Sequence, residues 1–115
     1  MSDSCLFCKI VSGEIKGTIV FRDDQATAFR DINPVGPTHI LIVPNRHIAS
    51  VNTLESGDEE LVGHLYRVAG QLAKSEGIDQ TGYRLITNTG PNAGQTIFHL
   101  HMHLIGGQPM KHPMG

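Results

Sequence analysis

The chain has 115 residues, 39% of them hydrophobic and 17% charged, with a formal net charge of −2 when histidines are neutral. This length and composition fit one globular domain, residues 1–115, and exclude a disordered chain. The nine Lys and Arg residues form no basic run, which excludes an electrostatic nucleic-acid binder, and no apolar stretch approaches the roughly 20 residues of a membrane-spanning helix.

The N-terminal segment contains two cysteines and a short apolar run. It lacks the charged and apolar regions of a signal peptide, so we expect a cytoplasmic protein. In that compartment Cys5 and Cys8 are better explained as thiols or metal ligands than as a disulfide, and their C-x-x-C spacing is that of half a zinc site. Residues 6–11 predict a helical turn or two that stops at Gly13.

The first half of the chain predicts three strands. Residues 19–21 and 27–29 are rich in β-forming side chains, and the polar segment between them favours a hairpin. Residues 31–38 contain two prolines and a glycine and therefore predict a loop. Residues 39–43 are a nearly unbroken apolar run that ends at Pro44, which is typical of a buried central strand.

One long amphipathic helix follows. Ser56 and Glu59 have the spacing of a capping box, and acidic residues at 58–60 suit the positive end of the helix dipole. Lys74 in the last turn and Gly77 just beyond it suit the helix end. Apolar residues recur at helical spacing and widen into one stripe: Leu61, Val62, Leu65, Val68, Ala69 and Leu72.

The remaining segments complete an α+β pattern. Residues 83–88 alternate as a strand, residues 89–94 form a glycine-rich loop, and residues 96–105 predict the last strand before an irregular tail. Short connections favour antiparallel pairing. The sequence thus predicts a five-stranded antiparallel sheet covered by one long helix, with a short N-terminal helix.

The last predicted strand carries a row of histidines. Strand side chains alternate between faces, so His99, His101 and His103 share one face. The apolar residues between them line the other face as an ordinary core surface. Three imidazoles on one face repel one another when protonated, which argues against their being ordinary surface residues without a function.

Two chemistries use such a row. One is a metal site, since His-X-His on a strand lets two imidazoles reach one ion. The other is nucleophilic catalysis on phosphorus, in which one neutral imidazole attacks while its neighbours hold phosphate oxygens. The preceding segment, residues 88–96, offers backbone N–H groups, hydroxyls and amides that suit a phosphate better than a metal.

Residues 99–105, His-Leu-His-Met-His-Leu-Ile, match the His-X-His-X-His-X-X motif of the histidine-triad (HIT) family, with X apolar. The chain resembles most closely the histidine-triad nucleotide-binding (HINT) branch, and this resemblance implies the HIT-like fold. Similar stretches extend over nearly the whole chain: residues 5–11, 29–34, 37–39, 43–44, 94–96 and 106–107.

The resemblance implies a homodimeric purine nucleoside phosphoramidate hydrolase that needs no cofactor for catalysis. It would act on adenosine 5′-phosphoramidate and release AMP and an amine through a nucleotidyl-histidine intermediate. By this likeness His101 is the nucleophile and His103 bonds the phosphate, while His99 and His39 orient the others and share protons.

The same resemblance implies a set of nucleotide contacts. Asp31 and Ile32 match the positions that contact ribose and base in the family. The Thr96 hydroxyl would also serve the leaving group. The positions on the phosphate side are Asn88, Gly94, Gln95 and Thr96.

Some bacterial HIT relatives with the N-terminal cysteine pair bind structural zinc. Here the corresponding ligands would be Cys5, Cys8, His47 and His99. His112 stands where animal HINT proteins carry a tryptophan, and this chain has none, so their amine specificity is not transferred.

Three alternatives stay open: a nucleotide-binding regulatory protein with vestigial catalysis, a dinucleoside polyphosphate hydrolase, and a metal-dependent enzyme built on the histidine row. His103 argues against the transferase branch, which usually has glutamine there. The preference between adenine and guanine is also left open.

Overall fold

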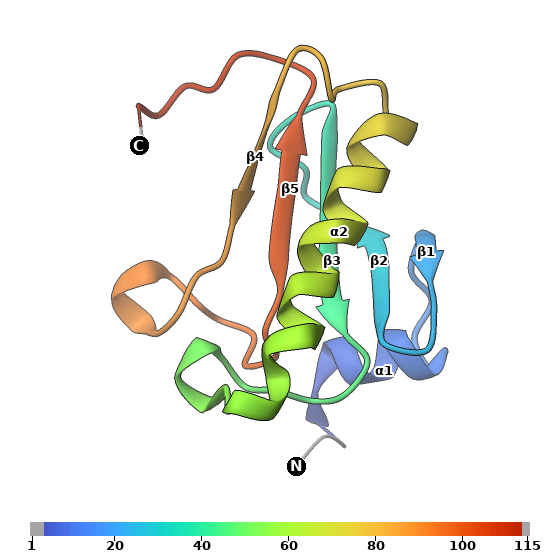
Figure 1. Ribbon diagram of the computed structural model, residues 1–115, viewed down its shortest axis with the longest axis vertical. Helices are drawn as coiled ribbons and strands as arrows, with labels where there is room; N and C mark the ends of the chain where they lie inside the picture. Colours follow the sequence, from blue (N-terminus) through green and yellow to red (C-terminus); the bar gives the residue numbers. More distant parts are fainter. Residues whose placement is uncertain (1–3, 114–115) are drawn as a thin grey trace.

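Five antiparallel strands form the sheet of the computed structural model, which describes residues 4–113. The strand order is β1-β2-β3-β5-β4. The α+β class with one long and one short helix is confirmed (Figure 1). The helices and strands are α1 (Leu6–Ser12), β1 (Ile19–Arg22), β2 (Ala26–Arg30), β3 (Thr38–Pro44), α2 (Glu59–Ser75), β4 (Tyr83–Ile86) and β5 (Met102–Gly106).

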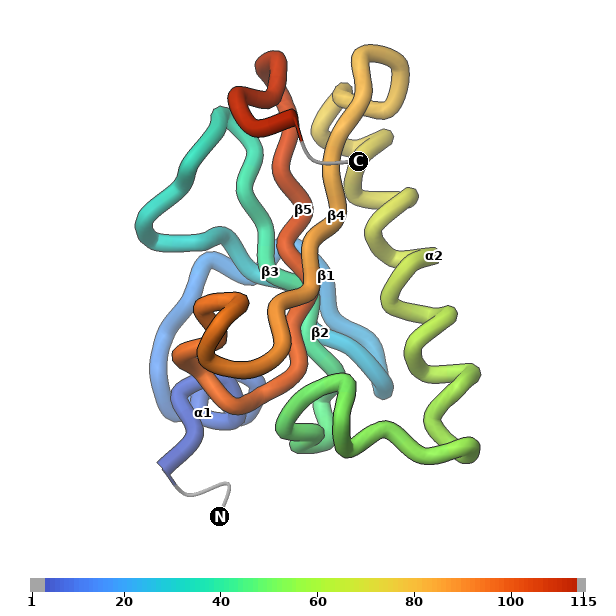
Figure 2. The backbone as a smooth tube through the Cα atoms, turned by 90° about the vertical axis from the view of Figure 1, so that its left-hand side faces the viewer, coloured from blue at the N-terminus to red at the C-terminus, as the bar shows by residue number. Residues whose placement is uncertain are grey.

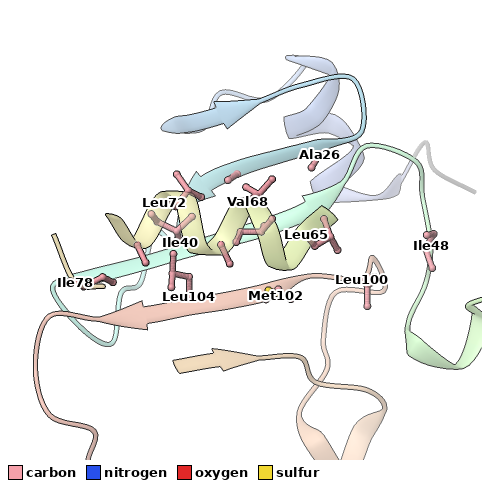
Figure 3. Close-up of a cluster of buried hydrophobic side chains, with 14 residues drawn as sticks. Ala26, Ile40, Ile48, Leu65, Val68, Leu72, Ile78, Leu100, Met102 and Leu104 are labelled. Atoms are coloured by element: carbon pink, nitrogen blue, oxygen red, sulfur yellow. The ribbon is translucent and has the colours of Figure 1, made fainter. Parts of the chain in front are cut away.

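Helix α2 covers one face of the sheet and closes the main core (Figure 3). On the strands every second side chain points to this face. Ile40 and Ile42 of β3 therefore lie beside Met102 and Leu104 of β5, their direct partners in the antiparallel register. From the helix, the buried residues are Leu65, Val68, Ala69, Leu72 and Ala73.

The opposite face is only partly covered, by α1 and two loops (Figure 2). Phe7 and Ile10, three residues apart on one side of α1, pack on Phe29, Leu41 and Val43. These three are the alternate side chains of β2 and β3 that point away from α2. The short helix therefore forms a second, smaller core and leaves room on this face for a site.

The predicted N-terminal helix is confirmed, and its two ends have identifiable causes. The Cys5 thiol accepts a hydrogen bond from the Cys8 N–H and caps the first turn. Gly13 ends the helix in the left-handed conformation, with φ +85°, and donates its N–H to the Ile10 carbonyl.

The last strand is shorter than the sequence predicts. β5 begins at Met102 rather than at residue 96. The preceding segment bonds elsewhere, since the Leu100 N–H donates to the Ile48 carbonyl at 2.6 Å. The sheet ladder therefore starts only after the histidine row has begun. β4 likewise ends at Ile86 rather than at residue 88.

The predicted capping box at the start of α2 is wrong. Ser56 lies in a 3₁₀ turn, Ser56–Asp58, that precedes the helix. Asp58 stands at the N-cap position of α2 but makes no side-chain bond to that helix: its carboxylate accepts the Glu55 N–H at 2.9 Å, which closes the 3₁₀ turn, and pairs with Arg46. Over residues 4–113, no helix has the length and apolar character needed to span a membrane.

Candidate active site

A cavity of about 480 Å³ opens on the sheet face away from α2. Its walls come from α1 and the segment after it, from strands β2, β3 and β5, from the loop after β2, and from the segment between β4 and β5. Of the predicted catalytic and nucleotide-contacting residues, only His99 does not line it. Those that do are Asp31, Ile32, His39, Asn88, Gly94, Gln95, Thr96, His101 and His103.

The proton of His101 is placed by a backbone carbonyl. Its Nδ1 lies 2.7 Å from the carbonyl oxygen of His99. Because a carbonyl only accepts, Nδ1 donates and Nε2 of the neutral ring carries the lone pair. The ring edge rests against Phe7, with centroids 5.0 Å apart at 88°. His101 thus offers an unprotonated Nε2 from a fixed ring.

A second backbone group fixes the proton position of His39 and, through His39, that of His103. The Val35 N–H donates to His39 Nδ1 at 3.2 Å, so the proton of neutral His39 is on Nε2. That Nε2 lies 2.9 Å from His103 Nδ1 and 3.4 Å from a carboxylate oxygen of Asp31. His39 therefore donates to His103, and neutral His103 keeps its own proton on Nε2 as a donor beside His101.

Burial keeps this pair of histidines neutral. Burial, helped by the nearby His101 and His39 rings and opposed by Asp31, lowers the pKa of His103 to about 4. Burial also lowers the pKa of His39, against the attraction of Asp31. At pH 7 the neutral hydrogen-bonded arrangement is consequently the populated one.

The loop after β2 holds two of the predicted contacts in different ways. Asp31 accepts the Asn33 N–H at 2.8 Å through one oxygen and faces His39 with the other. It therefore both caps a turn and contributes a carboxylate to the cavity. The Ile32 side chain is 90% exposed at the cavity mouth, where a bound molecule could cover it.

The glycine-rich loop is braced by Gln95. Its side-chain oxygen accepts the Gly90 N–H at 3.0 Å, and its amide nitrogen donates to the Ala49 and Ile97 carbonyls at 2.9 and 3.2 Å. Gly94 has φ +84°, a conformation that side chains disfavour. Gln95 is thus committed to shaping the loop that carries Thr96.

Four potential metal ligands converge at the N-terminal end of α1. Nδ1 of His99 lies 3.3 Å from Cys5 Sγ and 3.4 Å from Cys8 Sγ, and Cys8 Sγ lies 3.3 Å from His47 Nδ1. His99 donates its Nε2–H to the Pro44 carbonyl at 2.8 Å, so its Nδ1 lone pair faces the thiols. These four side chains could hold a divalent cation.

Without a cation this cluster disfavours the thiolate of Cys8. Burial and the adjacent Cys5 thiol together raise the pKa of Cys8 to about 11. Asp31, His39 and His103 form a second group close enough for one ion. Their ring nitrogens already bond one another and the backbone, which favours a hydrogen-bond chain there.

Sequence reasoning missed the apolar end of the cavity. Phe7, Ile10, Phe29 and Leu41 line it, with Lys16 at the rim. The spacing of Phe7 and Ile10 places them on one helix side, and this signal was available. The pairing of Phe29 directly opposite Leu41 in the sheet was not, because it depends on the β2–β3 register.

The chain resembles proteins of one family over nearly its whole length. A family model described as "HIT domain" matches residues 12–110. A protein of Escherichia coli strain K12 named purine nucleoside phosphoramidase is 48% identical over 110 residues, which cover 96% of this chain and 92% of that protein.

Solved structures show the same likeness. A HIT family hydrolase from Legionella pneumophila superposes with a TM-score of 0.94 at 47% identity, covering 97% of this chain and all of that one. A histidine triad nucleotide-binding protein from Candida albicans gives 0.82 at 28% identity, covering 97% and 85%.

The half-buried His103 makes stability depend on pH. Because folding lowers its pKa from 6.5 to about 4, protonation favours the unfolded chain as pH falls from 6.5 towards 4. We expect the unfolding free energy to drop between pH 7 and 5 by about 1–2 kcal/mol less in His103→Gln than in the wild type. Urea titrations at both pH values measure this, with the exposed His112→Gln as control. Equal drops in all three proteins would contradict the assignment.

Proposed function

The chain belongs to the HIT domain family, and we propose that it is a purine nucleoside phosphoramidase. The observation that carries the proposal is the His101 ring, whose Nδ1–H is held by the His99 carbonyl so that Nε2 is free to attack. The 48% identity to the E. coli phosphoramidase, over nearly the full length of both chains, supports the same activity.

We propose that the substrate lies along the cavity with its phosphorus at His101. The His103 Nε2–H would donate to a phosphate oxygen, and the Thr96 hydroxyl would face the leaving nitrogen. Asp31 would accept hydrogen bonds from the ribose hydroxyls, and Ile32 would cover the base. The base would rest at the apolar end, between Phe7, Ile10, Phe29 and Leu41.

The proposed reaction has two displacements at phosphorus. In the first, His101 Nε2 bonds to phosphorus, the P–N bond breaks, and the amine leaves with a proton passed from water through Thr96. In the second, the hydroxide left by that water attacks the nucleotidyl-histidine, the N–P bond breaks to return neutral His101, and the nucleoside monophosphate is released. The charge that the His101 ring gains is stabilised by the carbonyl that accepts its Nδ1–H.

We also propose that Cys5, Cys8, His47 and His99 hold one structural zinc ion. Their ligand atoms all lie within 4.8 Å of one another, and two sulfurs with two imidazole nitrogens complete a tetrahedral set. The ion would tie α1 to the segments that follow β3 and precede β5, and no hydrolytic step would use it. Zinc-binding thiolates also suit a reducing compartment, in keeping with the cytoplasmic location expected from the sequence.

A homodimer joined at the β4 edge is our third proposal. β4 lies at one end of the sheet, whereas the other edge strand, β1, has an irregular register that discourages further pairing. Beside β4, a shallow apolar groove runs between α2 and the sheet, with Val51 and Tyr66 exposed along it. A second copy would pair the strand and cover this groove.

His101→Ala should abolish hydrolysis of adenosine 5′-phosphoramidate, by at least about 1,000-fold in kcat, because no other group can form the intermediate. Far-ultraviolet circular dichroism and AMP binding should be retained. The matched control is His64→Ala, which removes a histidine on α2, across the sheet from the cavity. Undiminished turnover by His101→Ala would refute the nucleophile, and a wild type that binds AMP without turnover would favour the regulatory alternative.

Protein purified without chelators should contain one zinc per chain, and Cys8→Ser should lose it. Restoring zinc to the apoprotein should raise the thermal midpoint by about 5 °C or more, because the ion binds only the folded chain. Elemental analysis and thermal scans measure both, with Lys9→Ala as control. Metal-free wild-type protein would contradict the site, and turnover lost to chelators at temperatures where the protein stays folded would favour the metal-dependent alternative.

Sedimentation should give about twice the chain mass of 12.5 kDa. Tyr66→Glu places a charge in the apolar groove and should yield monomers. Gln71→Glu adds the same charge elsewhere on α2, outside the groove, and should remain dimeric. A monomeric wild type, or a dimer unaffected by Tyr66→Glu, would exclude this interface.

A further inference from the structure

The apolar end of the cavity has a cationic rim. The segment between α1 and β1, residues 13–18, runs on the same side of the sheet as the loop after β2 (Figure 2), and its Lys16 and Gly17 line the cavity. A Cβ at Gly17 would lie 3.2 Å from Ile10 Cγ2 and 3.9 Å from Phe29 Cβ. The backbone at Gly17 is therefore pressed against the apolar wall, which anchors Lys16 at its edge.

The ammonium of Lys16 forms no hydrogen bond or ion pair with the described residues, 4–113. The cavity's other permanent cation, Arg30, is held by Glu76 through two bonds of 2.8 Å. Asp31, the carboxylate of the cavity, faces His39 instead. Lys16 is thus the one permanent cation of the described cavity lining whose charge is available to a ligand.

Purines differ in what they would present to this charge. Guanine and hypoxanthine carry two adjacent acceptors, O6 and N7, whereas adenine carries N7 beside a donating amino group at position 6. A lysine ammonium is a donor only. It can donate to both acceptors of a 6-oxopurine. With adenine it can donate only to N7, because the amino group at position 6 is also a donor and accepts no hydrogen bond from it. Asn33, which also lines the cavity, offers both a donor and an acceptor and does not discriminate.

We propose that Lys16 is a specificity-determining residue that makes this enzyme favour 6-oxopurine nucleotides, guanosine and inosine, over adenosine. The inference rests on the proposed function, since it needs the base at the apolar end of the cavity. Phe7 and Phe29 pack edge to face there, with centroids 5.3 Å apart, and accept any purine. The preference for one purine over another is therefore set by the Lys16 ammonium at the rim of the cavity.

The test compares guanosine, inosine and adenosine 5′-phosphoramidates with one common amine, by kcat/KM. For the wild type we expect guanosine and inosine to exceed adenosine by about fivefold to tenfold, the effect of a charged hydrogen bond weakened by solvent. Lys16→Met keeps the length of the side chain and removes its charge. It should bring the three substrates within about twofold, mainly by slowing the 6-oxopurines.

Lys9→Met is the matched control, since Lys9 pairs with Glu14 and does not line the cavity. It should keep the wild-type ratios. Calorimetric titration with GMP, IMP and AMP should show the same order in Kd.

The experiment distinguishes failure of the proposed function from failure of the proposed role of Lys16. If the wild type hydrolyses none of the three substrates, the proposed function fails. Hydrolysis of all three with unchanged ratios in Lys16→Met would overturn the role of Lys16 alone. A preference for guanosine over both inosine and adenosine would also overturn it, because the 2-amino group would then be the feature recognised.

Discussion

The antiparallel pairing of β3 with β5 is the constraint on which both the core and the site depend. In this register Leu41 lies opposite His103, and Ile40 lies opposite Leu104. One face of the paired strands therefore buries aliphatic side chains under α2, while the other brings His39 diagonally against His103. A shift of one residue would exchange the two faces and place imidazoles in the apolar core. The stability of the core thus enforces the geometry of the histidines.

Backbone groups, which do not titrate, fix the protons of three histidines. The Val35 N–H makes Nδ1 of His39 an acceptor, and the carbonyls of His99 and Pro44 make His101 Nδ1 and His99 Nε2 donors. The neutral tautomers are therefore set by the fold. His99 acts twice, because its ring faces the cysteines while its carbonyl holds the ring of His101. The thiol cluster and the His101 ring are therefore joined through one residue of main chain, His99.

Most of the fold was predictable from local patterns. Alternation predicted the strands, helical spacing predicted α2, and Gly13 marked the end of α1, because these signals depend on neighbours within a few residues. The start of α2 was not predicted correctly, since Ser56 lies in a separate 3₁₀ turn and the Asp58 carboxylate bonds Glu55 and Arg46 instead of the helix. The path of the loop before the helix fixes these bonds, and the local residue spacing does not reveal it.

Local sequence pattern identified the reactive groups of the chain: three alternating histidines after a glycine-rich loop, and a C-x-x-C pair ahead of them. Tertiary structure decided how these groups are divided. Because the Leu100 N–H bonds the loop at Ile48, the ladder starts late, and the buried His99 ring turns to the thiols while His101 faces the cavity. It also brought Phe29 and Lys16 to one cavity. Such groupings arise from long-range packing, which no local periodicity encodes.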